Sequence, residues 1–144
     1  MAKIDMKTVK VLVIDDEPFM RQLLNKALAQ VEIQEIVGAV NGEDGLEKVK
    51  DNGGELDVIL CDLDMPEMNG FEFVRRLREL PDPGQANLPV VIVTGNSMEE
   101  SVRSAIELGI SGFLVKPVTA QALQQRIEKA ILSPRIDPAT VNKE

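Results

Sequence analysis

Residues 58–66 read Val-Ile-Leu-Cys-Asp-Leu-Asp-Met-Pro, and the arrangement of the whole chain follows from this stretch. Four apolar residues run directly into Asp62, and a second acid and a proline follow. A short apolar run bounded by turn signals is typical of a strand buried on both faces of a sheet. Asp62 then lies at the carboxyl end of this strand, the edge at which open parallel sheets bind ligands. A carboxylate held there is suited to be a nucleophile or a metal ligand, although a lone Asp at such a position more often caps the next element.

The composition is that of one soluble globular domain. The chain has 144 residues, of which 44% are hydrophobic and 28% charged, and its formal net charge is -8. The negative charge argues against nucleic acid as a partner, because phosphate backbones require a basic surface. The sequence contains no histidine, which excludes histidine metal ligands and histidine general bases. Its one cysteine, Cys61, lies within the apolar run and is interpreted as a buried hydrophobic residue in a reducing compartment.

No membrane segment or signal peptide is expected. Apolar spans stay well below the roughly 20 residues that a membrane helix needs, and residues 1–10 mix charged with apolar side chains. We therefore expect a cytoplasmic protein without a membrane partner.

Four further apolar runs share the character of the first. They lie at residues 9–15, 35–40, 88–94 and 113–115, and helical patterns separate them. Five strands that alternate with five helices, joined by right-handed crossovers, predict an α/β fold with a doubly wound parallel sheet covered on both faces. The expected helices begin near Pro18, Asn41, Gly70, Ser97 and Thr119, where Asn41 and Thr119 act as N-caps and Ser97 with Glu100 forms a capping box.

Three local features carry further expectations. In the first helix, apolar residues recur at helical spacing from Phe19 to Val31, through Met20, Leu23, Leu24, Ala27 and Leu28. The one dense basic cluster (Arg75, Arg76 and Arg78) is expected on a solvated face of the third helix. Residues 81–84, Pro-Asp-Pro-Gly, are expected to end that helix and begin a loop.

Polar side chains follow four of the five strands. Asp15 and Asp16 follow the first strand, Asp62 the third, Thr94 the fourth and Lys116 the fifth. In a parallel sheet these ends share one edge, so the side chains can converge. Three carboxylates close together repel, and at least one pKa should be raised unless a cation lies between them. An all-oxygen site that leaves coordination positions to water suits Mg²⁺, and a Lys with a hydroxyl would hold the oxygens of a phosphoryl group. The set is suited to placing a phosphoryl group on Asp62.

In the order of these motifs the chain resembles the receiver domain of two-component response regulators, most closely the chemotaxis-type single-domain members. The resemblance covers about residues 9–132. It implies a flavodoxin-like (βα)5 sheet in the order 2-1-3-4-5, which is the order of the family's chemotaxis members. It also implies an N-terminal extension at residues 1–8, a receiver domain at 9–132 and a mobile tail at 133–144. The motifs that carry the resemblance are Asp15-Asp16, Asp62-x-x-Met65-Pro66 with Gly70, Thr94-Gly95, and Lys116-Pro117.

The resemblance implies a phosphoacceptor and a magnesium site. Asp62 would accept the phosphoryl group. Asp16 and Asp62 would bind Mg²⁺ directly, Asp15 would act through a metal-bound water, and the backbone carbonyl of Asp64 would be a third protein ligand. The side chains of Asp64 and Asn96 would lie at the rim of the site, at positions that tune dephosphorylation in relatives. The sign of the Asp64 effect on phosphate lifetime stays open.

The resemblance also implies the residues that respond to phosphorylation. Lys116 would pair with the phosphoryl oxygens, and Thr94 would hydrogen-bond to one of them. The peptide bond from Lys116 to Pro117 would be cis. Phe113 lies where the family carries its aromatic switch residue, but core packing explains a large aromatic equally well. Because Phe has no hydroxyl, a switch at this position would work by ring position alone.

The implied function is that of a single-domain response regulator in a phosphorelay. A sensor histidine kinase or phosphotransfer protein would donate the phosphoryl group. The output would be protein binding at the face of the fourth helix, fifth strand and fifth helix, around residues 97–131. Because only a short tail follows the last helix, we expect no enzymatic output beyond the protein's own phosphorylation and dephosphorylation.

Two alternatives stay open at this point. One is a phosphatase of the haloacid dehalogenase type, whose nucleophile motif residues 62–64 mimic. In that family, however, the acidic metal pair follows the lysine in sequence, whereas here it comes first. The other alternative is a binding module that keeps the fold but is not phosphorylated.

Overall fold

A computed structural model describes residues 4–52, 54–95, 103–104 and 106–132. Five strands of this part form one sheet in the order β2-β1-β3-β4-β5, and all neighbouring strands are parallel. The predicted fold class and strand order are therefore confirmed. The strands are β1 (Lys10–Ile14), β2 (Glu35–Ala39), β3 (Val58–Cys61), β4 (Val90–Thr94) and β5 (Gly112–Val115).

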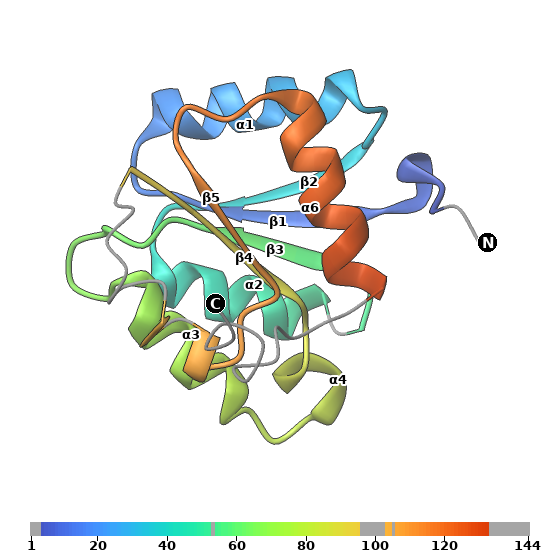
Figure 1. Ribbon diagram of the computed structural model, residues 1–144. Helices are drawn as coiled ribbons and strands as arrows, with labels where there is room; N and C mark the ends of the chain where they lie inside the picture. The colour runs from blue at the N-terminus through green and yellow to red at the C-terminus, as the bar shows by residue number, and fades with distance from the viewer. Residues whose placement is uncertain (1–3, 53, 96–102, 105, 133–144) are drawn as a thin grey trace.

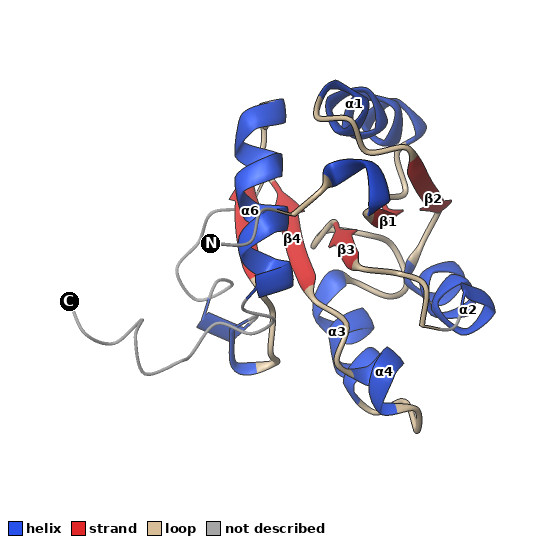
Figure 2. Cartoon of the chain, turned by 90° about the vertical axis from the view of Figure 1, so that its right-hand side faces the viewer, coloured by secondary structure: helices blue, strands red, loops and turns tan. Residues whose placement is uncertain are grey.

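Helices cover both faces of the sheet (Figures 1 and 2). On one face lie α1 (Pro18–Gln30) and α6 (Ala120–Leu132), and on the other lie α2 (Gly42–Asn52), α3 (Gly70–Arg78) and the short α4 (Pro83–Ala86). Residues 103, 104, 106 and 107 are also helical, whereas the expected capping box at Ser97 and Glu100 lies outside the described residues. A 3₁₀ turn, η1 (Met6–Thr8), precedes β1. In the described part of the chain, no helix is both long and apolar enough to cross a lipid bilayer.

The strands supply two hydrophobic cores, one on each face of the sheet. In β1, Val11 and Val13 pack in the core beneath α1 and α6, and Leu12 and Ile14 pack in the core beneath α2 and α3. This alternation follows from the pleat, which sends successive side chains to opposite faces. Each fully buried side chain of this size contributes about 1.5–3 kcal/mol relative to exposure, so the sheet is a rigid support for whatever lies at its ends.

Side chains cap the helices where the sequence predicts it. The Asp44 amide donates to Asn41 Oδ1 (2.8 Å), and the Val40 amide donates to Asp44 Oδ2 (3.0 Å), which together satisfy two N–H groups at the start of α2. The Ala122 amide donates to Thr119 Oγ1 (3.1 Å) at the start of α6. Both predicted N-caps are confirmed.

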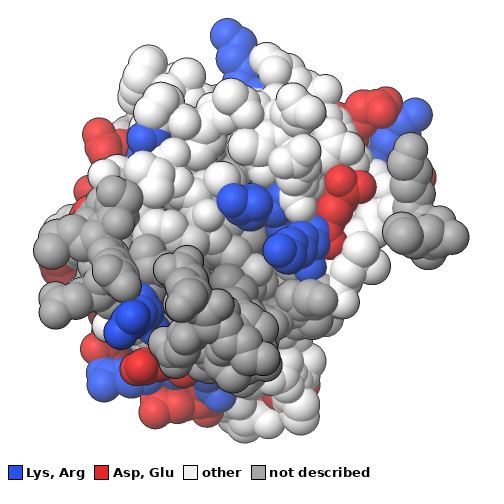
Figure 3. Space-filling model, viewed as in Figure 1, with Lys and Arg blue, Asp and Glu red and all other residues white. Residues whose placement is uncertain are grey.

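The apolar stripe expected on α1 is only partly buried. Leu24 and Leu28 are buried, but Phe19 is 69% exposed and Leu23 is 44% exposed. Phe19 and Leu23 lie one helical turn apart, so the helical spacing is present, but these two side chains reach solvent instead of the core. The surface over α1, at the top of Figure 3, is largely uncharged.

The basic cluster on α3 is divided between solvent and structure. Arg75 and Arg76 are exposed and pair with Glu72, as expected for a solvated face. Arg78 is half-buried instead, and its guanidinium donates to the backbone carbonyls of Ala86, Leu88 and Gly109. The expectation of a solvated face is therefore wrong for this arginine, which ties α3 to three segments that follow it in the chain.

A short helix occupies part of the region where a loop was expected. Asp82 caps helix α4 (Pro83–Ala86), and its Oδ1 accepts a hydrogen bond from the Gly84 amide (3.1 Å). Pro83 at the first helical position matches the preference of proline for that place. Helix α3 ends earlier, at Arg78, and the Pro-Asp-Pro-Gly residues start a helical turn instead of a loop.

Candidate functional site

Backbone hydrogen bonds to neighbouring strands fix the polar residues at the strand ends. The Asp15 amide donates to the last carbonyl of β2 (3.2 Å), and the Asp62 amide donates to the last carbonyl of β1 (3.0 Å). The Lys116 amide donates likewise to the last carbonyl of β4 (2.8 Å). Each residue is therefore the first one beyond its strand, fixed by one more hydrogen bond of the sheet pattern. Their side chains are positioned with the rigidity of the sheet rather than that of a loop.

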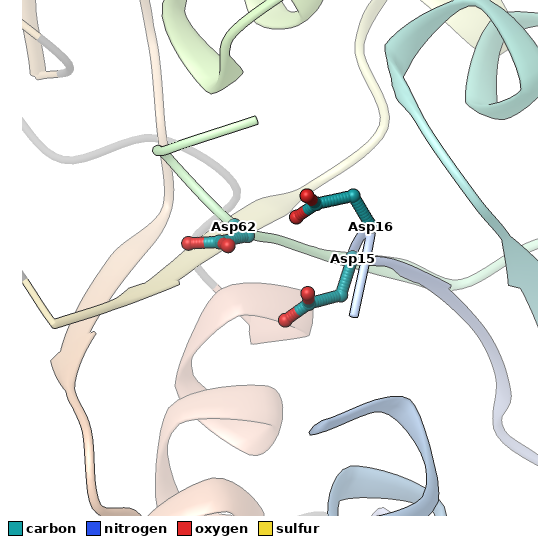
Figure 4. Close-up of side chains that lie close together, drawn as sticks. All are labelled: Asp15, Asp16 and Asp62. Atoms are coloured by element: carbon teal, nitrogen blue, oxygen red, sulfur yellow. The ribbon is translucent and has the colours of Figure 1, made fainter. Parts of the chain in front are cut away.

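Three carboxylates meet at this edge (Figure 4). Each of Asp15, Asp16 and Asp62 offers a carboxylate oxygen that lies within 4.8 Å of the others. Asp15 is fully buried and Asp62 is 5% exposed, whereas Asp16 is half-buried and reaches solvent. The convergence predicted from the strand ends is found for all three acids.

Lys116 reaches the cluster from β5. Its Nζ lies 3.3 Å from Asp15 Oδ2 and 3.6 Å from Asp62 Oδ2, and its side chain is 15% exposed. One ammonium group between three carboxylates leaves two negative charges uncompensated. A divalent cation would balance the site.

The electrostatics of Asp62 reflect this imbalance. Burial raises the pKa of the Asp62 carboxyl to about 6 from its ordinary value of 3.8, Lys116 lowers it, and the neighbouring Asp15 carboxylate raises it. The raised pKa expected for crowded carboxyls is present, but loss of hydration is a larger cause than repulsion. Burial likewise raises the pKa of the neighbouring Cys61 thiol, which keeps it protonated and unreactive.

The donor set fits a hard divalent cation. All three side chains offer oxygen, and the partial exposure of Asp16 leaves space on one side of the cluster for water ligands. Mg²⁺ characteristically binds one or two carboxylates and retains several waters. The residues present therefore fit a magnesium ion.

Thr94 and Asp64 form a second part of the site. Thr94, the last residue of β4, is fully buried, and its Oγ1 donates to Asp64 Oδ2 at 3.4 Å. The Asp64 amide in turn lies 3.4 Å from Asp62 Oδ1. Asp64 is exposed, so a residue in contact with solvent accepts the hydrogen bond of a buried hydroxyl.

Two supports of the site could not be predicted from single residue types. A Cβ on Gly70 would lie 2.7 Å from the Asp62 carbonyl oxygen, which is too close for any residue with a side chain. Glycine therefore allows the start of α3 to lie against the end of β3. Arg21 donates from Nη1 to the Asp15 carbonyl (2.6 Å), and the Glu17 amide donates to Asp15 Oδ1 (2.9 Å). Gly70 stood out in the sequence as a part of a motif, but the contact that requires it did not.

The remaining predicted residues lie on or near β5. Phe113 is half-buried in β5 and packs against the core beneath α2 and α3. The peptide bond between Lys116 and Pro117 is cis. Asn96 lies outside the described residues, as does the predicted tail at 133–144.

Comparisons with known proteins agree with this geometry. The sequence matches the family model of the response regulator receiver domain over residues 11–128. It is 30% identical over 120 residues to the chemotaxis protein CheY1 of Helicobacter pylori, covering 83% of this chain and 94% of that protein. It is 28% identical over 123 residues to the CheY homolog of Campylobacter jejuni, covering 85% and 92%.

Solved structures give the same picture. The structure of the Vibrio cholerae chemotaxis protein CheY4 superposes with a TM-score of 0.76 at 30% identity, covering 85% of this chain and 98% of that one. A chain of the CheX–CheY–BeF3–Mg²⁺ complex from Borrelia burgdorferi superposes with a TM-score of 0.76 at 25% identity, covering 83% and 86%. The range matched by the family model contains all four strand ends that carry the site.

Proposed function

Because this chain belongs to the response regulator receiver domain family, we propose that the Asp62 carboxylate is the group that accepts the phosphoryl signal. The observation that carries the proposal is the Lys116 ammonium, which lies within 3.6 Å of the Asp62 carboxylate beside two further acids. This places fixed positive charge where a phosphoryl group on Asp62 would need it. We propose bounds of 9–132 for the receiver domain, with residues 1–8 as an N-terminal extension and 133–144 as a tail.

Receiver domains use Mg²⁺ at their acidic pocket, and the three carboxylates here fit that ion. In the proposed site, Asp16 and Asp62 would bind the ion directly and Asp15 would act through a bound water. The backbone carbonyl of Asp64 would be the third protein ligand. When bound, Mg²⁺ supplies positive charge that offsets the negative oxygens of the phosphoryl group.

The proposed step is transfer from a phosphohistidine of a sensor histidine kinase or a phosphotransfer protein. A carboxylate oxygen of Asp62 forms the new O–P bond while the N–P bond of the donor breaks. The donor ring, already protonated at its other nitrogen, leaves as neutral imidazole. Lys116 pairs with the phosphoryl oxygens and Thr94 donates a hydrogen bond to one of them. Water later releases inorganic phosphate and restores the Asp62 carboxylate.

The proposed output is a change in protein binding. Phosphorylation adds about 1.5–2 negative charges and three strong acceptor oxygens, which biases an existing equilibrium between two conformations. Thr94 and Phe113 lie on the adjacent strands β4 and β5, so a movement of the hydroxyl toward the phosphoryl group has a short path to the Phe113 ring. The affected surface would comprise the helix that ends near residue 108, then β5 and α6. A cytoplasmic protein partner on this surface is proposed.

The alternatives gain no support from the site. Receiver domains act in signalling, generally without an enzymatic output, and the match to that family argues against a haloacid dehalogenase-type phosphatase. An unphosphorylated binding module would not need a buried carboxylate at the Asp62 position, where burial raises the pKa and so costs free energy at neutral pH. Self-labelling of Asp62 without turnover of a general phosphomonoester separates the proposal from the phosphatase.

The decisive experiment compares wild type with Asp62→Asn. Each is incubated with a small phosphodonor such as acetyl phosphate and Mg²⁺, and intact-mass spectrometry measures the phosphorylated fraction. Asp51→Asn, which changes an exposed acid on α2, is the matched control. Wild type and the control should be labelled stoichiometrically, and Asp62→Asn should not. Equal labelling of Asp62→Asn would move the acceptor to another residue.

A further inference from the structure

The Thr94 hydroxyl donates a hydrogen bond to a carboxylate in this structure. Its Oγ1 donates to Asp64 Oδ2 at 3.4 Å, across the mouth of the site from β4 to the β3–α3 loop. The Asp64 amide lies 3.4 Å from Asp62 Oδ1, so one residue contacts both the hydroxyl and the proposed phosphoacceptor. Asp64 is exposed and its side chain is not held in the core, whereas Thr94 is fully buried.

A hydroxyl has one proton and donates one hydrogen bond at a time. Thr94 therefore cannot donate to the Asp64 carboxylate and to a phosphoryl oxygen together. The contact to Asp64 is longer than the optimum of about 2.7–2.8 Å for a hydroxyl donor, so it is a weak bond that a better-placed acceptor can replace. A phosphoryl group on Asp62 would offer three strong acceptor oxygens.

We propose that Asp64 is a positioning residue that holds the Thr94 hydroxyl before phosphorylation and competes with the phosphoryl group for its proton. The inference rests on the proposed function, because it concerns the same acceptor. On phosphorylation, Thr94 gives up its hydrogen bond to Asp64 and forms one to a phosphoryl oxygen. The net gain in free energy is that of the phosphoryl bond minus that of the Asp64 bond. Removal of the Asp64 acceptor should thus favour the phosphorylated arrangement.

Asp64 also carries a negative charge near the proposed phosphoryl site, and this charge repels the group whatever Thr94 does. A double-mutant cycle separates the two effects. The first change, Asp64→Ala, removes the charge and the acceptor together. The second, Thr94→Val, keeps the shape of the side chain but removes the hydroxyl. In the Thr94→Val background, only the charge effect of Asp64→Ala remains.

The cycle is read from the affinity for beryllofluoride, an analogue of the phosphoryl group, at a fixed Mg²⁺ concentration. Fluorine-19 NMR is suitable because the chain has no Trp or Tyr to report binding by fluorescence. We expect Asp64→Ala to tighten binding about 2- to 3-fold more in the Thr94 background than in the Thr94→Val background, the lower end of the range for one hydrogen bond, because the contact is long. Asp64→Asn keeps an acceptor oxygen without the charge, so it should show little of this excess and tighten binding by nearly the same factor in both backgrounds. Equal factors for Asp64→Ala in the two backgrounds overturn the competition.

A second measurement tests the contact without any phosphoryl analogue. In protein with ¹³C-labelled threonine methyl groups, Asp64→Ala should shift the Thr94 methyl resonance, whereas Glu43→Ala, which removes an exposed acid from α2, should not. An unchanged Thr94 resonance in Asp64→Ala overturns the proposal whatever the site binds. If the resonance responds but neither wild type nor any variant binds beryllofluoride, the proposed function fails and the competition fails with it.

Discussion

Asp62→Asn should make the protein more stable in the absence of divalent cations. Folding raises the pKa of the Asp62 carboxyl from 3.8 to about 6. The protonated form is therefore favoured by the folded state, so this contribution to stability is complete below about pH 4 and is lost as the pH rises through 6. Above pH 7, the charged carboxylate costs about 3 kcal/mol, from a difference of roughly two pH units at 1.36 kcal/mol each. Asn has the shape of the protonated acid without its charge and removes this cost.

The assay is urea unfolding in EDTA, followed by far-ultraviolet circular dichroism. Wild type and Asp62→Asn are compared from pH 4 to pH 8, with Glu47→Gln on the exposed face of α2 as the control for loss of one acid. At pH 8 the Asn variant should be more stable by about 3 kcal/mol, or roughly 6–12 °C in melting temperature for a chain of this size. The difference should shrink through pH 6 and disappear near pH 4.

Mg²⁺ provides the second arm of the same test. A cation that binds only the folded protein adds about 1.4 kcal/mol at ten times its dissociation constant. Wild type should gain this stability at pH 8, and Asp62→Asn should gain less because one ligand has lost its charge. Equal stability of wild type and Asp62→Asn in EDTA at pH 8, or a difference that does not depend on pH, would refute the electrostatic account of the site.

Three further substitutions test the packing that supports the site. Arg78→Met should lower the free energy of unfolding by about 2 kcal/mol, because its guanidinium donates to three backbone carbonyls, whereas Arg75→Met on the solvated face should have no measurable effect in the same urea titration. Leu24→Ala should cost about 2–4 kcal/mol because it opens a cavity beneath α1, and Leu23→Ala, half-exposed one position earlier, should cost less than about 1 kcal/mol. Gly70→Ala should slow labelling by acetyl phosphate, because its Cβ would press on the Asp62 carbonyl, and an unchanged rate with an unchanged fold would contradict that contact.

The convergence of the site residues could be predicted because it follows from topology. Apolar runs with turn signals locate the strand ends, and right-handed crossovers bring all parallel strand ends to one edge. Asp15, Asp62 and Lys116 each follow directly after a strand, and the sheet hydrogen bonds of their amides fix them there. Because the backbone alone fixes these three positions, they can be predicted from the order of residues along the chain.

Features that depend on side-chain conformation or on contacts distant in sequence could not be predicted. The apolar residues of α1 extend over about half of its circumference, so their period identifies the helix but does not tell which of them face the sheet. Phe19 is therefore exposed although it continues the pattern. The three carbonyls that bind Arg78 come from segments up to 31 residues away, and nothing in the sequence of α3 marks it as different from Arg75.

The uncompensated negative charge of the site lowers the stability of the fold, and the same charge is what the proposed chemistry needs. Lys116 compensates one of three carboxylates, and a second basic residue in the cluster would remove the cost that burial places on Asp62. Such a residue would also occupy the space and the charge that a divalent cation needs, and the Asp62 carboxylate would then be locked in a permanent ion pair. If the site is to bind and release a cation and a phosphoryl group, the protein's own side chains cannot neutralise all of its carboxylates. Burial therefore raises the pKa of Asp62, and among the described residues no second cationic side chain of the cluster offsets that effect.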